Sequence, residues 1–229
     1  MIYFYDLHIH SVLSQDADEL MTPHNIFNMA YLKKLDIIAV TDHNSLKNIP
    51  ICAKISESYD ILFIPGVEIS VKEGCHILCY FKYVHEAMAF DQILEKYLDK
   101  KPYDQAIFGD QEMTDIHDEV IEVIPYDLSQ TLDLSIEDLK RLLNPYEHLL
   151  VYAHIDRKKH GALEYFKVKP LNAIELTEKS NPDHYQSFKT IRNSDAHTII
   201  HILERTKENQ IELKNLTVDD FFEVFNKHD

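Results

Sequence analysis

The chain has 229 residues, enough for one domain with a large core, and 45% of them are hydrophobic. Its formal net charge of −16 opposes nonspecific binding to nucleic acid, and no apolar run is long enough to cross a membrane. The three cysteines (Cys52, Cys75 and Cys79) lack disulfide-framework spacing, and no signal peptide precedes the first apolar run, so we expect a cytoplasmic protein.

Apolar runs alternate with helical patterns along the chain, which indicates βα units and a parallel sheet. The predicted strands are residues 2–6, 36–40, 61–65, 76–81, 149–153, 171–176 and 189–193. The predicted helices are one that Thr22 caps, with Pro23 in its first turn, and those at 45–58, 86–99, 135–143 and 216–226. Residues 100–134 read as an irregular insert or hairpin. No linker marks a boundary, so we expect a single domain over residues 1–229.

Two histidines, His8 and His10, stand two residues apart at the end of the first apolar run. In an extended strand, residues i and i+2 point to the same face, so both imidazoles can approach one point while Leu7 and Ile9 face the other side. Two converging imidazoles suit a divalent transition metal. A strand that carries histidines on its polar face by chance shows the same pattern.

Further potential ligands lie at or near the ends of the other apolar runs. They are His43, Glu68, His76, His154, Asp195 and His197. Asp195 and His197 repeat the i, i+2 spacing with one carboxylate. Ligands at the C-terminal ends of strands are typical of barrel enzymes, a rule that His76 fits poorly because it begins its run. Periodicity by itself also allows an open doubly wound sheet.

The order of these motifs resembles a known family. They are Asp6-x-His8-x-His10-Ser11, Thr41-Asp42-His43, Pro65-Gly66-Val67-Glu68, His76-Ile77-Leu78, Ala153-His154 and Ser194-Asp195-Ala196-His197. In this order they are similar to the PHP family, named for the polymerase and histidinol-phosphatase domains, and to its stand-alone bacterial members. The resemblance implies an α/β fold, a distorted (β/α)7 TIM-like barrel, with residues 100–134 near the pocket mouth.

The resemblance also implies a trinuclear metal site. One ion would be held by His8, His10, Glu68 and Asp195, a second by Glu68, His76 and His154, and a third by Asp18, His43 and His197. Asp16 competes with Asp18, because Glu19 replaces the glycine that the family commonly has there. Nitrogen and oxygen ligands suit zinc, manganese or iron, so we expect two to three divalent ions. Asp6 and Asp42 are expected to orient ligand histidines through the second ring nitrogen.

These ligands predict hydrolysis of a phosphate ester by a metal-bridging hydroxide, with Arg157 clamping the phosphate and Asp195 or His197 handling the proton. Lys158, Lys159 and His160 could extend the basic patch around Arg157. The acidic composition favours a phosphomonoesterase on a small phosphorylated metabolite or nucleotide, with no membrane partner and long nucleic acid unlikely. The alternatives are a phosphodiesterase or exonuclease on short nucleic acid, a non-catalytic metal-binding PHP module, and an amidohydrolase-like enzyme acting on C–N bonds.

Overall fold

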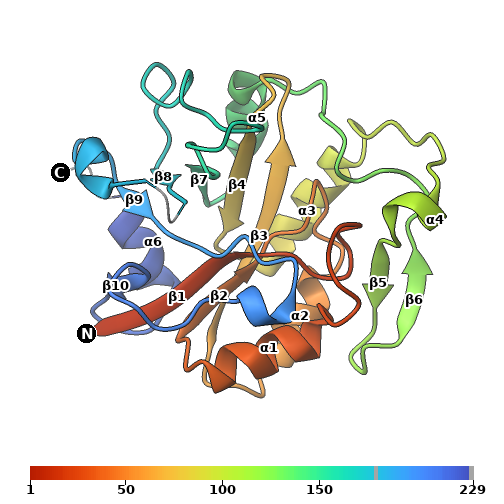
Figure 1. Ribbon diagram of the computed structural model, residues 1–229, viewed down its shortest axis with the longest axis horizontal. Coiled ribbons are helices and arrows are strands. Elements are labelled where there is room, and N and C mark those ends of the chain that lie inside the picture. The colour runs from red at the N-terminus through yellow and green to blue at the C-terminus, as the bar shows by residue number, and fades with distance from the viewer. Residues whose placement is uncertain (178–179, 227–229) are drawn as a thin grey trace.

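One curled sheet of eight strands forms the centre of the molecule (Figure 1). The computed structural model describes residues 1–177 and 180–226. The strands lie in the order β10-β1-β2-β3-β4-β7-β8-β9. Their bounds are β1 Ile2–Ile9, β2 Ile37–Val40, β3 Leu62–Ser70, β4 His76–Phe81, β7 His148–Tyr152, β8 Ala173–Glu175, β9 Thr190–Ile191 and β10 Gln210–Glu212.

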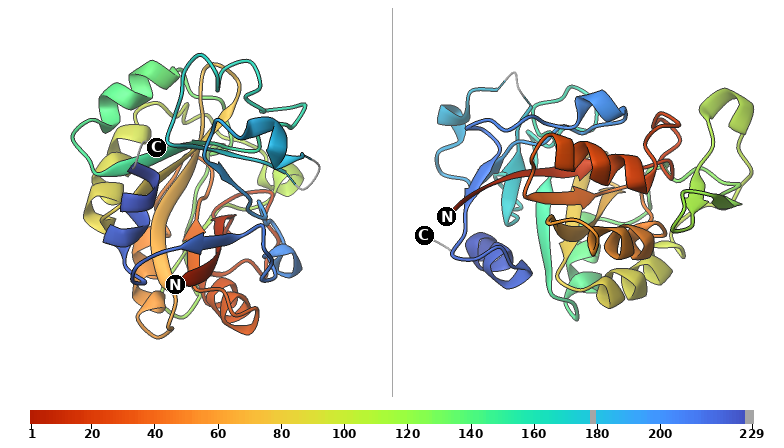
Figure 2. Two further views of the ribbon diagram at one scale, coloured as in Figure 1. Left: turned by 90° about the vertical axis from the view of Figure 1, so that its left-hand side faces the viewer. Right: turned by 90° about the horizontal axis from the view of Figure 1, so that it is seen from below.

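Helices cover the convex side of this sheet and one end of its interior (Figure 2). They are α1 Pro23–Leu32, α2 Ile49–Ser56, α3 Val84–Leu94, α5 Ile136–Leu143 and α6 Val218–Asn226. The predicted cap of α1 is confirmed, because the Thr22 side chain accepts a hydrogen bond from the amide of Asn25 and Pro23 begins the helix. Ser135 caps α5 in the same way, through the amide of Asp138.

The predicted α/β fold with a barrel-like sheet is confirmed. The strands do not, however, follow the predicted pattern of seven parallel βα repeats. β3 pairs antiparallel with β4, and β4 pairs antiparallel with β7, because only a short turn separates β3 from β4. β10, which the sequence analysis did not predict, pairs antiparallel with β1. The sheet curls until the segment after β9 reaches β1, where Ile9 and Ala196 form a parallel bridge.

Strand β3 is longer than predicted and contains the Pro65-Gly66 pair that the motif suggested as its end. β4 pairs with β3 only from Gly66 onward, so the missing amide hydrogen of Pro65 breaks no bond to that neighbour. A Cβ at residue 66 would lie 2.7 Å from Cγ2 of Thr41, so only glycine allows the strands to approach this closely. Glu68 therefore lies inside a paired strand, where its orientation is fixed.

The core has two apolar clusters, one on each side of the sheet. Leu7 packs with α6 in the interior cluster, whereas Ile9 packs with α1 and α2 in the outer one. The prediction that Leu7 and Ile9 share one layer is wrong, because β1 shifts its register against β2 between Asp6 and Ile9.

Residues 100–134 contain a short helix and a hairpin that stands apart from the main sheet (Figure 1). These elements are α4 Gln105–Phe108, β5 Glu112–Thr114 and β6 Val120–Val123. The predicted hairpin is thus present, and Ser129, after its second strand, reaches the cavity described below.

Candidate metal centre

Glu68 lies at the centre of the candidate site, with its carboxylate 1% exposed. Its Oε1 lies 3.3 Å from Nε2 of His8, 3.0 Å from Nδ1 of His76 and 3.0 Å from Nε2 of His154. Its Oε2 lies 3.0 Å from Nδ1 of His43 and 3.6 Å from Nε2 of His10. Five imidazoles from four segments of the chain therefore surround one buried carboxylate.

His76 reaches this centre although it begins β4. Because β4 runs antiparallel to β3, Ser70 at the end of β3 pairs with His76 at the start of β4. β7 is antiparallel to β4 in turn, so His154, just beyond β7, lies at the same edge of the sheet. The reversed strand thus resolves the conflict with the rule for parallel strand ends.

His8, His10 and Asp195 form one side of the site, as the motif order predicts. Oδ1 of Asp195 lies 3.1 Å from Nε2 of both histidines, and the two Nε2 atoms are 3.1 Å apart. Asp195 and His154 also have positive φ angles, 51° and 29°, which are unfavourable for residues other than glycine. Strained backbone of this kind is concentrated at functional sites.

The structure brings Asp16, not Asp18, to His43 and His197. Its carboxylate oxygens lie 3.4 Å from Nε2 of His43 and 3.2 Å from Nε2 of His197. The Asp18 carboxylate instead accepts a hydrogen bond from the amide of Leu20, two residues ahead, and belongs to a local turn. The structure therefore favours Asp16 over Asp18 as the ligand beside His43 and His197.

Three groups of ligand atoms lie close enough together to hold an ion. They are His8, His10 and Glu68; Glu68, His76 and His154; and His10, His43 and His197. Among the described residues, Nδ1 of His43 and Oδ1 of Asp195 are buried without a hydrogen-bond partner, although oppositely charged groups lie within ion-pair distance. These side-chain atoms thus point toward the same space without forming hydrogen bonds to one another. This arrangement is typical of a site that binds a cation. The residues present therefore fit divalent metal.

The buried charges perturb the protonation of these side chains strongly. Burial and the neighbouring charges of His197 and His43 lower the pKa of His10 to about 3, so its imidazole is neutral and free to bind metal. Burial opposes the charge on His43, but Asp16 and Glu68 outweigh it and raise the pKa of His43 to about 10. The pKa of Glu68 is held well below its usual range because His76, His8 and His154 outweigh its burial.

Glu175 is a functional candidate that sequence analysis missed. It lies on β8, is 3% exposed, and both of its carboxylate oxygens lie 3.1 Å from Nδ1 of His8. The amide of His154 and the Nδ2 group of Asn193 also donate to it. Glu175 therefore orients His8 from behind, the role that was expected of a different carboxylate.

Within the described residues, neither Asp6 nor Asp42 forms a hydrogen bond with an imidazole. Asp6 accepts from the amides of Ser194 and Leu203, so it fixes the backbone next to Asp195. Asp42 accepts from Ser14 Oγ, which in turn lies 2.9 Å from Nδ1 of His10. The hydroxyl of Ser14 thus stands where a carboxylate was expected.

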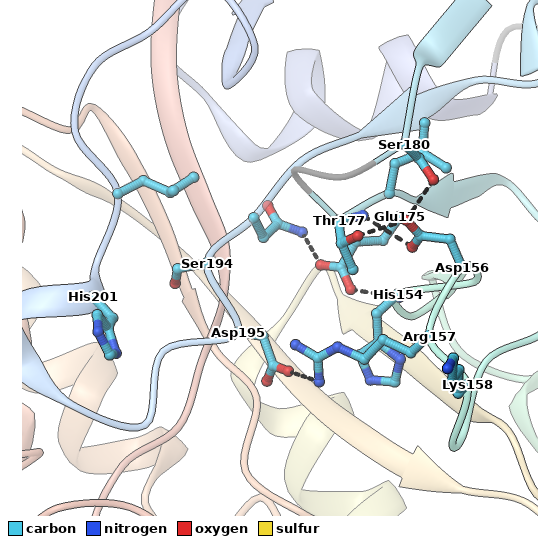
Figure 3. Close-up of a pocket in the computed structure, with 13 residues that line it drawn as sticks. His154, Asp156, Arg157, Lys158, Glu175, Thr177, Ser180, Ser194, Asp195 and His201 are labelled. Carbon is cyan, nitrogen blue, oxygen red and sulfur yellow. Dashed lines mark hydrogen bonds and ion pairs between the residues drawn. The ribbon is translucent and has the colours of Figure 1, made fainter. Parts of the chain in front are cut away.

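Two cavities open beside the centre and share Arg157, His154 and Asp195 in their walls. The smaller, of about 250 Å³, contains the histidine cluster and also His160, whose ring stacks on His76 with centroids 4.4 Å apart. The larger, of about 640 Å³, is lined by acidic and basic side chains, among them Asp156 and Lys158, and by neutral polar ones such as Thr177 and Ser180 (Figure 3). The guanidinium of Arg157 points to Asp195, with Nη1 2.5 Å from Oδ2.

Comparison with known proteins shows which solved structures share this fold. No model of a known protein family matches the chain. An uncharacterised protein of Methanocaldococcus jannaschii is 30% identical over 77 residues, which cover 30% of this chain and 45% of that protein. The lesion-specific endonuclease EndoQ of Pyrococcus furiosus superposes with a TM-score of 0.73 at 20% identity, over 98% of this chain and 56% of EndoQ. The chain thus spans about half the length of these two proteins.

Two full-length likenesses support the same fold. An amidohydrolase from Chromobacterium violaceum has a TM-score of 0.62 at 18% identity and is covered over 96% of both chains. A proposed metal-dependent phosphoesterase from Bifidobacterium adolescentis has a TM-score of 0.59 at 14% identity, with 90% of this chain and 91% of that chain covered. The chain therefore shares the fold of these two proteins, and its own histidine- and carboxylate-lined centre lies at the strand ends.

The expectation of a small phosphorylated partner, with long nucleic acid unlikely, is contradicted by these comparisons. A structure of Endonuclease Q with a 27-mer duplex that carries an abasic lesion at the active site matches this chain over 98% of its length, with a TM-score of 0.71. A net charge of −16 does not exclude a nucleic-acid partner, because a sum over the whole chain does not give the charge beside the site. None of the helices in the described part of the chain combines the length and hydropathy of a membrane span.

Proposed function

We propose that this chain is a metal-dependent hydrolase of the PHP type that cleaves phosphodiester bonds in nucleic acid. The observation that carries the proposal is the position of Glu68, whose two oxygens lie within 3.6 Å of five imidazoles. A carboxylate between so many imidazoles is typical of a centre in which neighbouring metal ions share one ligand.

Each group of ligand atoms has a proposed role. His8, His10, Glu68 and Asp195 would hold one ion, Glu68, His76 and His154 a second, and Asp16, His43 and His197 a third. The donor set contains nitrogen and oxygen but no thiolate, which suits zinc, manganese or iron. Divalent ions at these positions lower the pKa of a water molecule and add positive charge beside a phosphate.

The remaining chemistry is assigned to side chains at the junction of the two cavities. Arg157 has further guanidinium N–H groups beyond the one directed at Asp195, and these donate to the non-bridging oxygens of a phosphate. Asp195 would accept the proton of the attacking water through Oδ2, because its Oδ1 faces His8 and His10 at the first ion position. Serine or cysteine is not needed as a nucleophile, and the three cysteines are buried in the outer apolar cluster.

The choice of nucleic acid rests on the likeness to EndoQ, whose solved complex contains duplex DNA. Since the likeness is at 20% identity and covers 56% of EndoQ, the substrate of this chain is a proposal to be tested directly. Lesion recognition is part of the same test, because the neighbour is described as lesion-specific.

The test combines metal analysis with cleavage assays on the purified protein. Labelled duplexes with and without one abasic site, labelled single strands, and bis(p-nitrophenyl) phosphate are incubated with zinc, manganese or iron. We expect cleavage of a phosphodiester and its loss in His8→Ala, while circular dichroism shows a retained fold. Full turnover by a folded His8→Ala protein would refute the proposed centre, and metal binding without any cleavage would indicate a non-catalytic PHP module.

A further inference from the structure

The two cavities meet at a basic loop between β7 and β8. Arg157 lines both cavities, Lys158 lines only the larger one, and Lys159 and His160 line only the smaller one. Lys158 and Lys159, although consecutive, therefore line different cavities, and the Arg157–Asp195 pair lies where the two cavities meet. This division cannot be read from the sequence, where the two lysines are equivalent.

Backbone contacts hold this loop in place. The amide of Arg157 donates to the carbonyl of His154, and the amide of Ala162 donates to the carbonyl of Ile155. The carbonyl of His160 accepts from the amide of His76 at the start of β4. A Cβ at Gly161 would lie 2.1 Å from the carbonyl oxygen of Arg157, so this tight closure requires glycine. The loop is thus a formed part of the site.

The lysines are the available cations at this position. Within the described residues, neither Lys158 nor Lys159 has a carboxylate within ion-pair distance. The acidic groups of the larger cavity have other partners. Asp156 accepts from the hydroxyls of Thr177 and Ser180, Glu175 lies against His8, and Asp195 lies against Arg157. Arg157 through His160 contains no acidic residue, so the loop is locally positive on a chain of net charge −16.

We propose that a nucleic-acid strand crosses this loop with the reacting phosphate at Arg157 and with the flanking phosphates on opposite sides held by Lys158 and Lys159. The larger cavity, of about 640 Å³, has room for a nucleotide, since ligand pockets of this kind measure roughly 300–1,000 Å³. This inference rests on the proposed function and extends it. It explains how an acidic chain binds a polyanion, because only the charges next to the strand act strongly over a Debye length of about 10 Å.

The test compares Lys158→Gln and Lys159→Gln with Lys54→Gln, an exposed lysine of α2 that lines neither cavity. Two substrates are used, bis(p-nitrophenyl) phosphate, which has no flanking phosphate, and a labelled oligothymidylate with one abasic site. In ~0.1 M salt, each loop variant should lower kcat/KM for the oligonucleotide about five- to eightfold more than kcat/KM for the small diester. The reason is that each variant loses one contact to a flanking phosphate, which the small diester does not have. The slope of log(kcat/KM) against log(salt) should fall by about one. Lys54→Gln should match the wild type.

Oligonucleotides with a single methylphosphonate then show which flanking phosphate each lysine contacts. The cleaved bond is mapped, and the phosphate on one side or the other is replaced by its neutral analogue. We expect one replacement to remove the effect of Lys158→Gln and the opposite replacement to remove that of Lys159→Gln. If both variants lose their effect with the same replacement, or if both match Lys54→Gln, the inference is wrong while the proposed function stands. If the wild type cleaves neither substrate, the proposed function itself fails.

Discussion

Nδ1 of His8 lies 3.1 Å from both carboxylate oxygens of Glu175, and this buried pair joins β1 to β8. The contact fixes the imidazole ring with Nε2 directed at Glu68 and Asp195. It also fixes the tautomer, because a carboxylate that accepts at Nδ1 leaves Nε2 with a lone pair for a metal ion. The tautomer at the centre is thus set by a residue outside the ligand groups.

Replacement of Glu175 by glutamine should weaken metal binding without removing a ligand. Three donors, from His8, His154 and Asn193, converge on this carboxylate, and an amide offers only one oxygen to them. We expect the affinity for zinc or manganese to fall by about 10- to 100-fold. Titration calorimetry on the metal-free protein measures it. Glu57→Gln, on an exposed side chain after α2, is the matched control, and an unchanged affinity in Glu175→Gln would refute the orienting role.

Asp16→Ala and Asp18→Ala should behave differently although the two residues are neighbours. Asp16 lies against His43 and His197, so its loss should weaken the ion proposed there and lower the metal content measured by elemental analysis. Asp18→Ala should keep that content and lose about 1 kcal/mol of stability, since only the hydrogen bond from Leu20 is removed. A loss of metal in Asp18→Ala alone would reverse the assignment.

Metal should stabilise the folded protein measurably. Ions that bind only the folded state at a concentration near 100 times Kd add about 2.7 kcal/mol for each site. For a chain of this size that corresponds to a rise in Tm of about 5–10 °C for one site. Differential scanning calorimetry with a chelator and then with added zinc measures the shift. The His8→Ala protein should show a smaller rise, and an equal rise would place the ions elsewhere.

Asp156→Asn should reduce stability at neutral pH but not at low pH. Burial opposes ionisation of Asp156, but hydrogen bonds from Ser180 and Thr177 outweigh it and hold the pKa of the carboxyl below its usual 3.8. Its contribution is therefore complete above about pH 4 and is lost as the pH falls through the lower folded value. We expect about 1–3 kcal/mol at pH 7, from urea unfolding, and a smaller difference near pH 3. Asp60→Asn is the control, because Asp60 is exposed and accepts no such hydrogen bond within residues 1–177 and 180–226.

Much of the candidate site could be predicted because its motifs are local. His8 and His10 share a face through the two-residue period of a strand, and Asp195 and His197 repeat the spacing. Glu175 escaped notice because it lies on a strand of three residues with no motif beside it. The spacing to Pro23 favours Asp18 over Asp16, but a loop has no period that relates side-chain direction to sequence position, so only the structure identifies Asp16.

The sequence by itself determined the α/β character, the chemical type of the ligands and the segments that carry them, because apolar periodicity and donor chemistry are properties of neighbouring residues. The tertiary structure decided that β4 is reversed, which brings His76 to the edge where His154 lies. It also decided that Lys158 and Lys159 border different cavities. These outcomes depend on pairing and packing between segments far apart in the chain, and no local pattern encodes them.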